Sequence, residues 1–228
     1  MGSIATISEI KNFLICPTCK SAELTHFYKK IQCNRCNTIY KYCNNHPVMV
    51  DFNKSVLNKK KFFENDGSSF VKRRKVSIPK KIKNFFSSDS RITKKNIYKI
   101  INLLNVYKNP RILIIGGGTM GNGIENLYKF ENIISFDIYS SKHITLIADA
   151  HSLPFKNLSF DLVIIQAVLE HVLEPNLVVS EIERVTKGNG LVYSETPFMQ
   201  QVHEGAYDFT RFTESGHRYL FKNFDCIN

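Results

Sequence analysis

Four of the six cysteines in this 228-residue chain form two close pairs near the N-terminus. The pairs read Cys16-Pro-Thr-Cys19 and Cys33-Asn-Arg-Cys36, while Cys43 and Cys226 stand apart. A Cys-x-x-Cys turn aims two thiolates at one ion, and two such turns complete the tetrahedral four-sulfur site that Zn²⁺ prefers. Because protein would fill all four positions and leave none for water, we predict a structural zinc site formed by Cys16, Cys19, Cys33 and Cys36. A redox pair is the alternative.

The segment around these pairs, residues 12–53, is too short to fold on a hydrophobic core alone. A chain of about 40 residues usually needs a metal or a disulfide, so the metal would supply much of the folding free energy. Beyond the cysteines the segment contains Ile39-Tyr40 and His46-Pro47-Val48-Met49. With the cysteine pairs, this pattern resembles a small zinc-ribbon family whose members activate methyltransferases as separate subunits or as fused N-terminal domains. The usual Gly-Ile-Pro-Val of that family is Asn45-His46-Pro47-Val48 here.

A glycine-rich turn follows the first apolar run in the second half of the chain. Ile112–Ile115 leads directly into Gly116-Gly117-Gly118-Thr119-Met120-Gly121, a Gly-x-Gly-x-x-Gly spacing. Such a turn lets backbone approach a ligand closely and points helix N–H groups at it. Asp137 ends the next apolar run, where a carboxylate accepts hydrogen bonds from ribose hydroxyls. Gly116, Gly118, Gly121 and Asp137 are therefore predicted to bind a nucleoside cofactor, either NAD or S-adenosylmethionine.

Later motifs distinguish between these two cofactors. They are Ala148-Asp149-Ala150 with Leu153-Pro154-Phe155, Phe160-Asp161-Leu162-Val163, Val168-Leu169-Glu170-His171-Val172, and Glu183-Arg184-Val185 with Lys187-Gly188-Asn189-Gly190. In this order and spacing they resemble the class I S-adenosylmethionine-dependent methyltransferases of the type 11 group. The resemblance implies that Asp149 binds the adenine amino group beside the backbone of Ala150, and that Gln166 and Ala167 border the sulfonium. Many such enzymes carry an acidic residue where this chain has Ile114.

The acceptor side is predicted to lie after the fifth apolar run, in the polar stretch from Glu195 to Thr213. Loops at the carboxyl ends of parallel strands are where open α/β sheets bind ligands. Methyl transfer to a hydroxyl requires removal of its proton, so we interpret His203 as the base, oriented by Glu204 or Asp208. Arg211 would hold an anionic group of the acceptor. In the alternative interpretation, Asp208 and Arg211 pair with each other and only fix the loop.

These residues require a scaffold in which short apolar strands alternate with helices. Five strands are predicted over Ile112–Ile115, Ile133–Phe136, Ile144–Ile147, Leu162–Ile165 and Leu191–Ser194. Helices are predicted over Ile97–Tyr107, Gly123–Phe130, Leu177–Val185 and Glu214–Lys222, the last capped by Thr213. The alternation indicates an α/β fold with a Rossmann-like, doubly wound, mostly parallel sheet. A sixth strand would begin at Phe224, so we expect the sheet to be truncated within it.

Charge divides the chain into unlike parts. Residues 1–110 contain 22 Lys and Arg against 6 Asp and Glu, whereas residues 111–228 contain 9 against 14. We predict a zinc ribbon over 12–53, a basic and partly helical linker over 54–95, and a methyltransferase domain over 96–228 with an incomplete C-terminus. The basic half fits RNA, anionic lipid or an acidic partner, and equally a solvated linker. Without an apolar run of about 18 residues or a signal peptide, a cytoplasmic protein is expected.

Together these features predict an S-adenosylmethionine-dependent methyltransferase that acts on an oxygen or nitrogen of a small molecule or saccharide, with structural zinc. An RNA methyltransferase is the alternative that the basic half supports. The acidic C-terminal half and the lack of an Asn/Asp-Pro-Pro-Tyr motif after the fourth predicted strand favour the small acceptor. A non-catalytic zinc-ribbon binding module with a degenerate methyltransferase body is a further alternative, and an NAD-dependent dehydrogenase is the least favoured.

Overall fold

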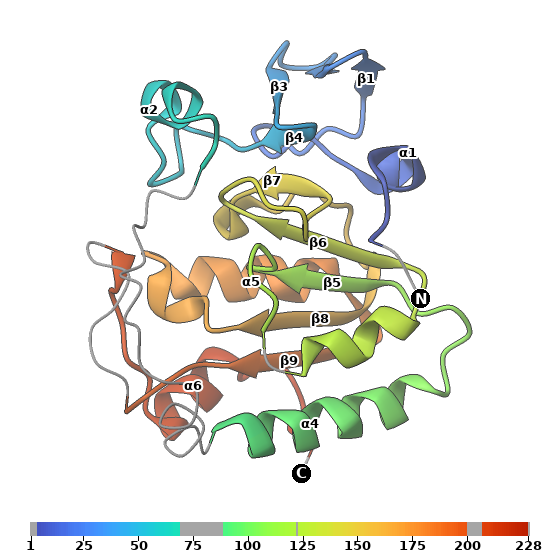
Figure 1. The fold of residues 1–228 in the computed structure, drawn as a ribbon, viewed down its shortest axis with the longest axis vertical. Coiled ribbons are helices and arrows are strands. Elements are labelled where there is room, and N and C mark those ends of the chain that lie inside the picture. The colour runs from blue at the N-terminus through green and yellow to red at the C-terminus, as the bar shows by residue number, and fades with distance from the viewer. Residues whose placement is uncertain (1–3, 69–88, 122, 200–206, 228) are drawn as a thin grey trace.

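The computed structural model describes residues 4–68, 89–121, 123–199 and 207–227. Within these ranges, nine strands form one sheet in the order β1-β2-β3-β4-β7-β6-β5-β8-β9. Strands β4 to β9 are parallel where they pair, and helices cover both faces of this part (Figure 1). The predicted Rossmann-like, mostly parallel α/β fold is therefore confirmed.

The strands and helices have the following bounds. The N-terminal strands are β1 (Leu24–Phe27), β2 (Lys30–Cys33), β3 (Ile39–Cys43) and β4 (His46–Met49). The strands of the second half are β5 (Ile112–Ile115), β6 (Ile133–Asp137), β7 (Leu146–Ala148), β8 (Phe160–Gln166) and β9 (Thr186–Glu195). The α-helices are α1 (Ile7–Ile10), α2 (Lys59–Glu64), α4 (Asp89–Leu104), α5 (Pro175–Val185) and α6 (Glu214–Leu220). Short 3₁₀ helices are η1 (Lys11–Phe13), η2 (Ile124–Lys129), η3 (Ala150–Ser152) and η4 (Leu169–His171).

The cysteine-containing segment is continuous with the parallel sheet. Strands β1 to β4 form an antiparallel meander, and β4 then pairs in parallel with β7 through Val48 opposite Ile147 and Met49 opposite Ala148. Pairing covers an edge of β7 that would otherwise expose unpaired backbone groups. The N-terminal segment therefore extends the sheet, as Figure 1 shows at its upper end.

Alternate residues of β5 and β8 face opposite layers of the core. Ile112 and Ile114 pack with the apolar side of α4, whereas Leu113 and Ile115 pack with α5. Side chains alternate across a strand, and a strand covered on both faces reads as a continuous apolar run. This explains why β5 is Ile-Leu-Ile-Ile and is buried at every position.

The strand order reverses beside β5. Strands β5, β6 and β7 run outward on one side, and β8 and β9 follow on the other. In doubly wound sheets, the carboxyl ends of the two strands at this reversal border the ligand crevice. The ends of β5 and β8 are Ile115 and Gln166, so the glycine turn after β5 lies at the switch point.

Several predicted elements have other bounds in the structure, and two differ in kind. The helix predicted over Gly123–Phe130 is a 3₁₀ helix over Ile124–Lys129, because Gly123 at its N-cap has a left-handed conformation (φ 81°) that interrupts an α-helical start. No strand begins at Phe224 within the described residues up to 227. Phe224 instead packs against Phe221, 5.9 Å away between ring centroids, and its N–H is bonded to the Phe221 carbonyl.

Thr213 caps α6 as predicted, since its hydroxyl accepts a hydrogen bond from Gly216 N–H. Among the described residues, no helix combines the length and apolar character that a membrane span requires.

Candidate functional site

The four paired cysteines meet in one cluster between the β1–β3 meander and the α/β core. Their Sγ atoms all lie within 4.8 Å of one another, with Cys16 and Cys36 at 3.6 Å and Cys19 and Cys33 at 3.5 Å. A disulfide requires about 2.05 Å between sulfurs, so no bond joins these pairs. Tetrahedral zinc with Zn–S bonds of about 2.3 Å places its sulfurs just under 4 Å apart. The donor set and spacing therefore fit a zinc ion.

A buried tyrosine contacts this cysteine cluster. Tyr40 is 2% exposed, and its hydroxyl lies 2.9 Å from Cys16 Sγ and 3.1 Å from Thr18 Oγ1. Burial and the neighbouring thiol raise the pKa of Tyr40, so the hydroxyl stays protonated and can donate to a thiolate. Hydrogen bonds of this kind orient metal ligands.

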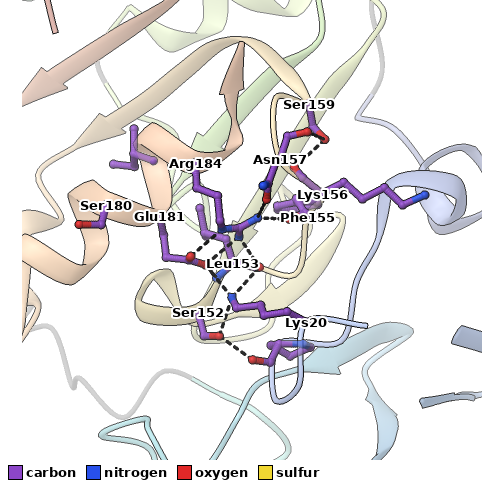
Figure 2. A network of polar contacts seen from close by, with 12 residues as sticks. Lys20, Ser152, Leu153, Phe155, Lys156, Asn157, Ser159, Ser180, Glu181 and Arg184 are labelled. Atoms are coloured by element: carbon purple, nitrogen blue, oxygen red, sulfur yellow. Dashed lines mark hydrogen bonds and ion pairs between the residues drawn. The ribbon is translucent and has the colours of Figure 1, made fainter. Parts of the chain in front are cut away.

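A network centred on Glu181 links the Cys16–Cys19 turn to the core (Figure 2). Lys20, which follows the turn in a left-handed conformation (φ 59°), donates to Glu181 Oε2 at 2.8 Å and to Ser152 Oγ at 3.0 Å. Glu181 also accepts from Leu153 N at 2.7 Å and from Arg184 at 2.7 and 2.8 Å. We call Lys20, Glu181, Arg184, Ser152 and Leu153 the Glu181 network.

This network continues toward the predicted nucleoside site. Ser152 Oγ donates to the Pro17 carbonyl at 2.7 Å, so a residue of η3 binds the cysteine turn directly. The same 3₁₀ helix contains Ala150 and His151 and is capped by Asp149. The Cys16–Cys19 turn and the Asp149 side chain are therefore linked through the same 3₁₀ helix, η3.

The glycine turn after β5 is packed too tightly for side chains. At Gly116 (φ 77°), a Cβ would lie 2.2 Å from Val168 Cγ2, so both conformation and space require glycine. At Gly118, a Cβ would lie 2.7 Å from Asp137 Oδ2. At Gly121, it would lie 1.8 Å from Gln166 Oε1. The three predicted glycines are thus placed together, beside Asp137 and the end of β8.

Asp137 lies at the end of β6 and faces this turn. Its Oδ2 accepts from Gly118 N at 2.9 Å, and its Oδ1 accepts from Ile138 N at 2.7 Å. A carboxylate at the carboxyl end of a parallel strand, beside a glycine turn, can accept hydrogen bonds from ribose hydroxyls.

Asp149 lies at the end of β7 and is 5% exposed. Its Oδ1 accepts from His151 N at 3.0 Å and from His151 Nδ1 at 2.6 Å, and its Oδ2 accepts from the Ser55 hydroxyl. Burial would raise the pKa of Asp149, but these hydrogen bonds overcome it and lower the pKa, so the group is ionised at neutral pH. Most of its acceptor capacity is therefore satisfied within the protein. Ser55 and His151 are partners that sequence reasoning did not identify.

A pocket opens where the glycine turn meets β8. Its walls include Ile114, Gly116, Gly121, Ile124, Ile164 and Gln166. Most of these wall groups are aliphatic side chains or glycine backbone, and Gln166 contributes a side-chain amide. Its Nε2 donates to Glu195 Oε2 at 3.0 Å. Glu195, the last residue of β9, was not predicted as a site residue, although its place at the carboxyl end of a parallel strand would have indicated it.

The predicted acceptor residues divide between described and undescribed parts of the chain. His203 and Glu204 lie outside the described residues. Asp208 and Arg211 form a two-pronged ion pair, with Arg211 Nη2 to Asp208 Oδ2 at 2.7 Å and Arg211 Nη1 bonded to Asp208 Oδ1. The pairing that the alternative interpretation requires is therefore present, while the roles of these residues toward an acceptor stay predictions.

A family model described as a methyltransferase domain matches residues 123–194. The matched range contains Asp137, Asp149 and Gln166 but neither the cysteine cluster nor the turn at Gly116–Gly121. No curated protein matches the chain.

Several solved structures are similar at low sequence identity. A chain of the complex between the Haloferax volcanii Trm112 methyltransferase activator and a candidate methyltransferase is 17% identical, covers 59% of this chain and 70% of that chain, and has a TM-score of 0.40. A candidate methyltransferase from Bacillus halodurans is 23% identical, with 43% and 46% covered and a TM-score of 0.34. An S-adenosylmethionine-dependent methyltransferase from Thermotoga maritima is 16% identical, with 59% and 71% covered and a TM-score of 0.44. The chain thus spans less than half the length of the Bacillus halodurans protein.

Proposed function

We propose that this chain is an S-adenosylmethionine-dependent methyltransferase that acts on an oxygen or nitrogen of a small molecule or saccharide. The observation that carries the proposal is the glycine turn at the switch point of the sheet, whose Gly118 N–H binds the Asp137 carboxylate beside an open pocket. The methyltransferase-domain match over 123–194 supports this activity over an NAD-dependent dehydrogenase.

The glycine turn and the carboxylates at the ends of β6 and β7 suit such a cofactor, which would supply a methyl group activated on its sulfonium. Gly116, Gly118 and Gly121 would let the cofactor approach the backbone. Asp137, which is bonded to Gly118 N–H of the glycine turn, would accept hydrogen bonds from ribose hydroxyls. Asp149 keeps about one free lone pair for an adenine amino group, beside the Ala150 backbone.

On the acceptor side, we propose that His203 removes the proton from the acceptor, with Glu204 or Asp208 orienting it. A histidine suits this role because its ordinary pKa lies close to neutrality. Arg211 would bind an anionic group of the acceptor alongside its contact with Asp208, since a guanidinium has five N–H donors.

The N-terminal segment is proposed to act as a structural activator within the same chain. The pairing of β4 with β7 and the Glu181 network together support the part of the sheet that ends in Asp149. A zinc ion held by Cys16, Cys19, Cys33 and Cys36 would stabilise this support without taking part in the chemistry.

One described surface favours RNA as a second candidate acceptor. Lys30 and Lys41 lie directly opposite each other on β2 and β3, an arrangement that costs stability. Phe27 pairs with Lys30, is 46% exposed, and has the Lys30 ammonium 4.6 Å from its ring centroid. Residues 24–50 contain four Lys and Arg and no Asp or Glu. Adjacent lysines and an exposed aromatic ring suit single-stranded RNA, through its phosphates and its bases.

Two measurements test these proposals. Calorimetric titration of the zinc-loaded protein with S-adenosylhomocysteine should give micromolar binding, whereas NAD should give none. If the folded protein does not bind S-adenosylhomocysteine, the non-catalytic alternative is supported.

For the acceptor, salt-sensitive binding of single-stranded RNA that weakens in a Lys30→Gln/Lys41→Gln variant would favour RNA, and unchanged binding would favour the small molecule.

A further inference from the structure

The side-chain amide of Gln166 has a defined orientation in the pocket. Its Nε2 donates to Glu195 Oε2 at 3.0 Å, on the side of β9. Its Oε1 points the other way, toward Gly121, and is buried with no hydrogen-bond partner among the residues that the structure describes. The nitrogen end is therefore satisfied by the protein, and the oxygen end is presented to the pocket.

Glu195 imposes this orientation. An ionised carboxylate has acceptors only, so it can bind the NH₂ end of the Gln166 amide but not its carbonyl. Strand register sets Glu195 directly opposite Gln166 across β8 and β9. The Glu195 main chain also holds the turn after Gln166, since its carbonyl accepts from Ala167 N at 2.8 Å. Ala167 there has a left-handed conformation (φ 53°), which is uncommon for a residue with a side chain.

Glu195 is itself fixed from two further elements. Its Oε1 accepts from Thr93 Oγ1 of α4 at 2.7 Å, and its Oε2 accepts from the Tyr193 hydroxyl at 2.6 Å. Burial, together with the neighbouring carboxylate, raises the pKa of Tyr193, so this hydroxyl remains a donor. Thr93, Tyr193 and Gln166 therefore all donate to the Glu195 carboxylate, and these three bonds hold it against Gln166.

A buried carbonyl oxygen without a donor is costly, and such groups in native proteins usually have a partner in a functional state. Of the residues that line the pocket, Ile114, Ile124 and Ile164 have no side-chain donor. The pocket lining also contains hydroxyl and backbone N–H donors, but among the described residues none of them bonds to Gln166 Oε1. The missing partner must therefore carry an N–H or O–H group. A cationic amine fits best, because the nearby Glu195 carboxylate adds favourable charge.

We propose that Glu195 is a positioning residue that holds Gln166 Oε1 as the acceptor for the amino group at the amino-acid end of the cofactor. This inference rests on the proposed function, because S-adenosylmethionine and its homocysteine product both carry that amino group. The pocket would then select for an amine at this point, and an otherwise identical ligand without the amine leaves Gln166 Oε1 unpaired.

The test compares S-adenosylhomocysteine with its deaminated analogue, in which a hydrogen replaces the amino group. Calorimetric Kd values for both ligands give a ratio that a general loss of structure does not change. The wild-type protein is expected to prefer the amino compound by about 10- to 150-fold, the range for one hydrogen bond that involves a charged group. Gln166→Leu should reduce this ratio to below about threefold.

Glu195→Gln is the critical variant. Its amide can offer either end to Gln166, so Gln166 is no longer held with Oε1 toward the pocket, and the ratio should fall by about tenfold. Glu214→Gln removes a carboxylate that pairs with Arg218 on the exposed face of α6, and it should leave the ratio unchanged.

The possible results distinguish a failure of this inference from a failure of the proposed function. A wild-type protein that binds both ligands equally well overturns the role of Gln166 and Glu195 but leaves the proposed function intact. A wild-type protein that binds neither overturns the proposed function and this inference with it. If Glu195→Gln weakens both ligands equally, Glu195 only stabilises the fold, and the positioning role is wrong.

Discussion

Replacing Glu181 by alanine tests whether the cysteine turn and the α/β core are stabilised as one unit. The Glu181 side chain is 10% exposed and accepts hydrogen bonds from Lys20, Leu153 and Arg184. Removing it leaves the buried Leu153 N–H without its acceptor and two cations without their carboxylate. Breaking a buried charge pair from one side costs about 3–5 kcal/mol. In a chain of this size, each kcal/mol lowers the melting temperature by about 2–4 °C, so we expect a decrease of roughly 10 °C.

Thermal unfolding of the zinc-loaded protein, followed by circular dichroism, measures this change. Glu183→Ala is the matched control, because Glu183 lies two residues further along α5, is exposed, and bonds only to Asn223 among the hydrogen bonds described. Its effect should stay within about 0.5 kcal/mol. A Glu181→Ala protein that melts within about 2 °C of the wild type would show that the Glu181 network does not join the two parts energetically.

The Glu181 carboxylate also makes the stability of the protein depend on pH. Burial would raise the pKa of Glu181, but hydrogen bonds from Arg184 and Lys20 overcome burial and lower the pKa. A carboxylate with a lowered pKa contributes stability above its unfolded pKa of about 4.3 and loses that contribution as pH falls through the folded value. The melting-temperature difference between wild type and Glu181→Gln should therefore be largest near pH 7 and shrink below about pH 4. A difference that does not change between pH 7 and pH 3.5 contradicts the network as described.

Three further predictions concern the metal, the glycine turn and the acceptor side. Elemental analysis should find one zinc per chain, and its removal by a chelator should lower the melting temperature and abolish the effect of Glu181→Ala; full stability without metal would refute a structural zinc. Gly118→Ala should weaken S-adenosylhomocysteine binding by at least about tenfold, because its Cβ would lie 2.7 Å from Asp137 Oδ2, and calorimetry against wild type checks this. His203→Ala should lose most turnover on the true acceptor while still binding S-adenosylhomocysteine, and full turnover would remove His203 from the mechanism.

The sequence predicted β5, β6 and β8 well because each is a short apolar run between polar turns. Ile112–Ile115 was placed with its observed bounds, and β8 was found two residues short at its start and one at its end. The crossover after the glycine turn was predicted less well. Apolar spacing over Gly123–Phe130 suits an α-helix, and it does not reveal that Gly123 adopts a left-handed conformation at the N-cap, where a Cβ would lie 3.2 Å from Ile97 of α4.

Contacts between distant segments were the main features that the sequence did not predict. The four cysteines were found by spacing alone, yet spacing does not show that Tyr40 of β3 contacts Cys16, nor that Lys20 after the cysteine turn pairs with Glu181 of α5. Likewise, Asp137 and Gln166 were indicated by position and resemblance, whereas Ser55 reaches Asp149 across 94 residues. Glu195 was identified as the start of the acceptor segment, but its hydrogen bond with the Gln166 amide depends on the register of β8 and β9.

The central claim is that the glycine turn and Asp137 form a site for the S-adenosyl group. Calorimetric titration of zinc-loaded Asp137→Ala with S-adenosylhomocysteine tests it most directly, with Asp225→Ala as a control at an exposed carboxylate. Micromolar binding is expected for the wild type and the control, with a loss of about 10- to 150-fold for Asp137→Ala. Equal binding by a folded Asp137→Ala protein would contradict this assignment of the site.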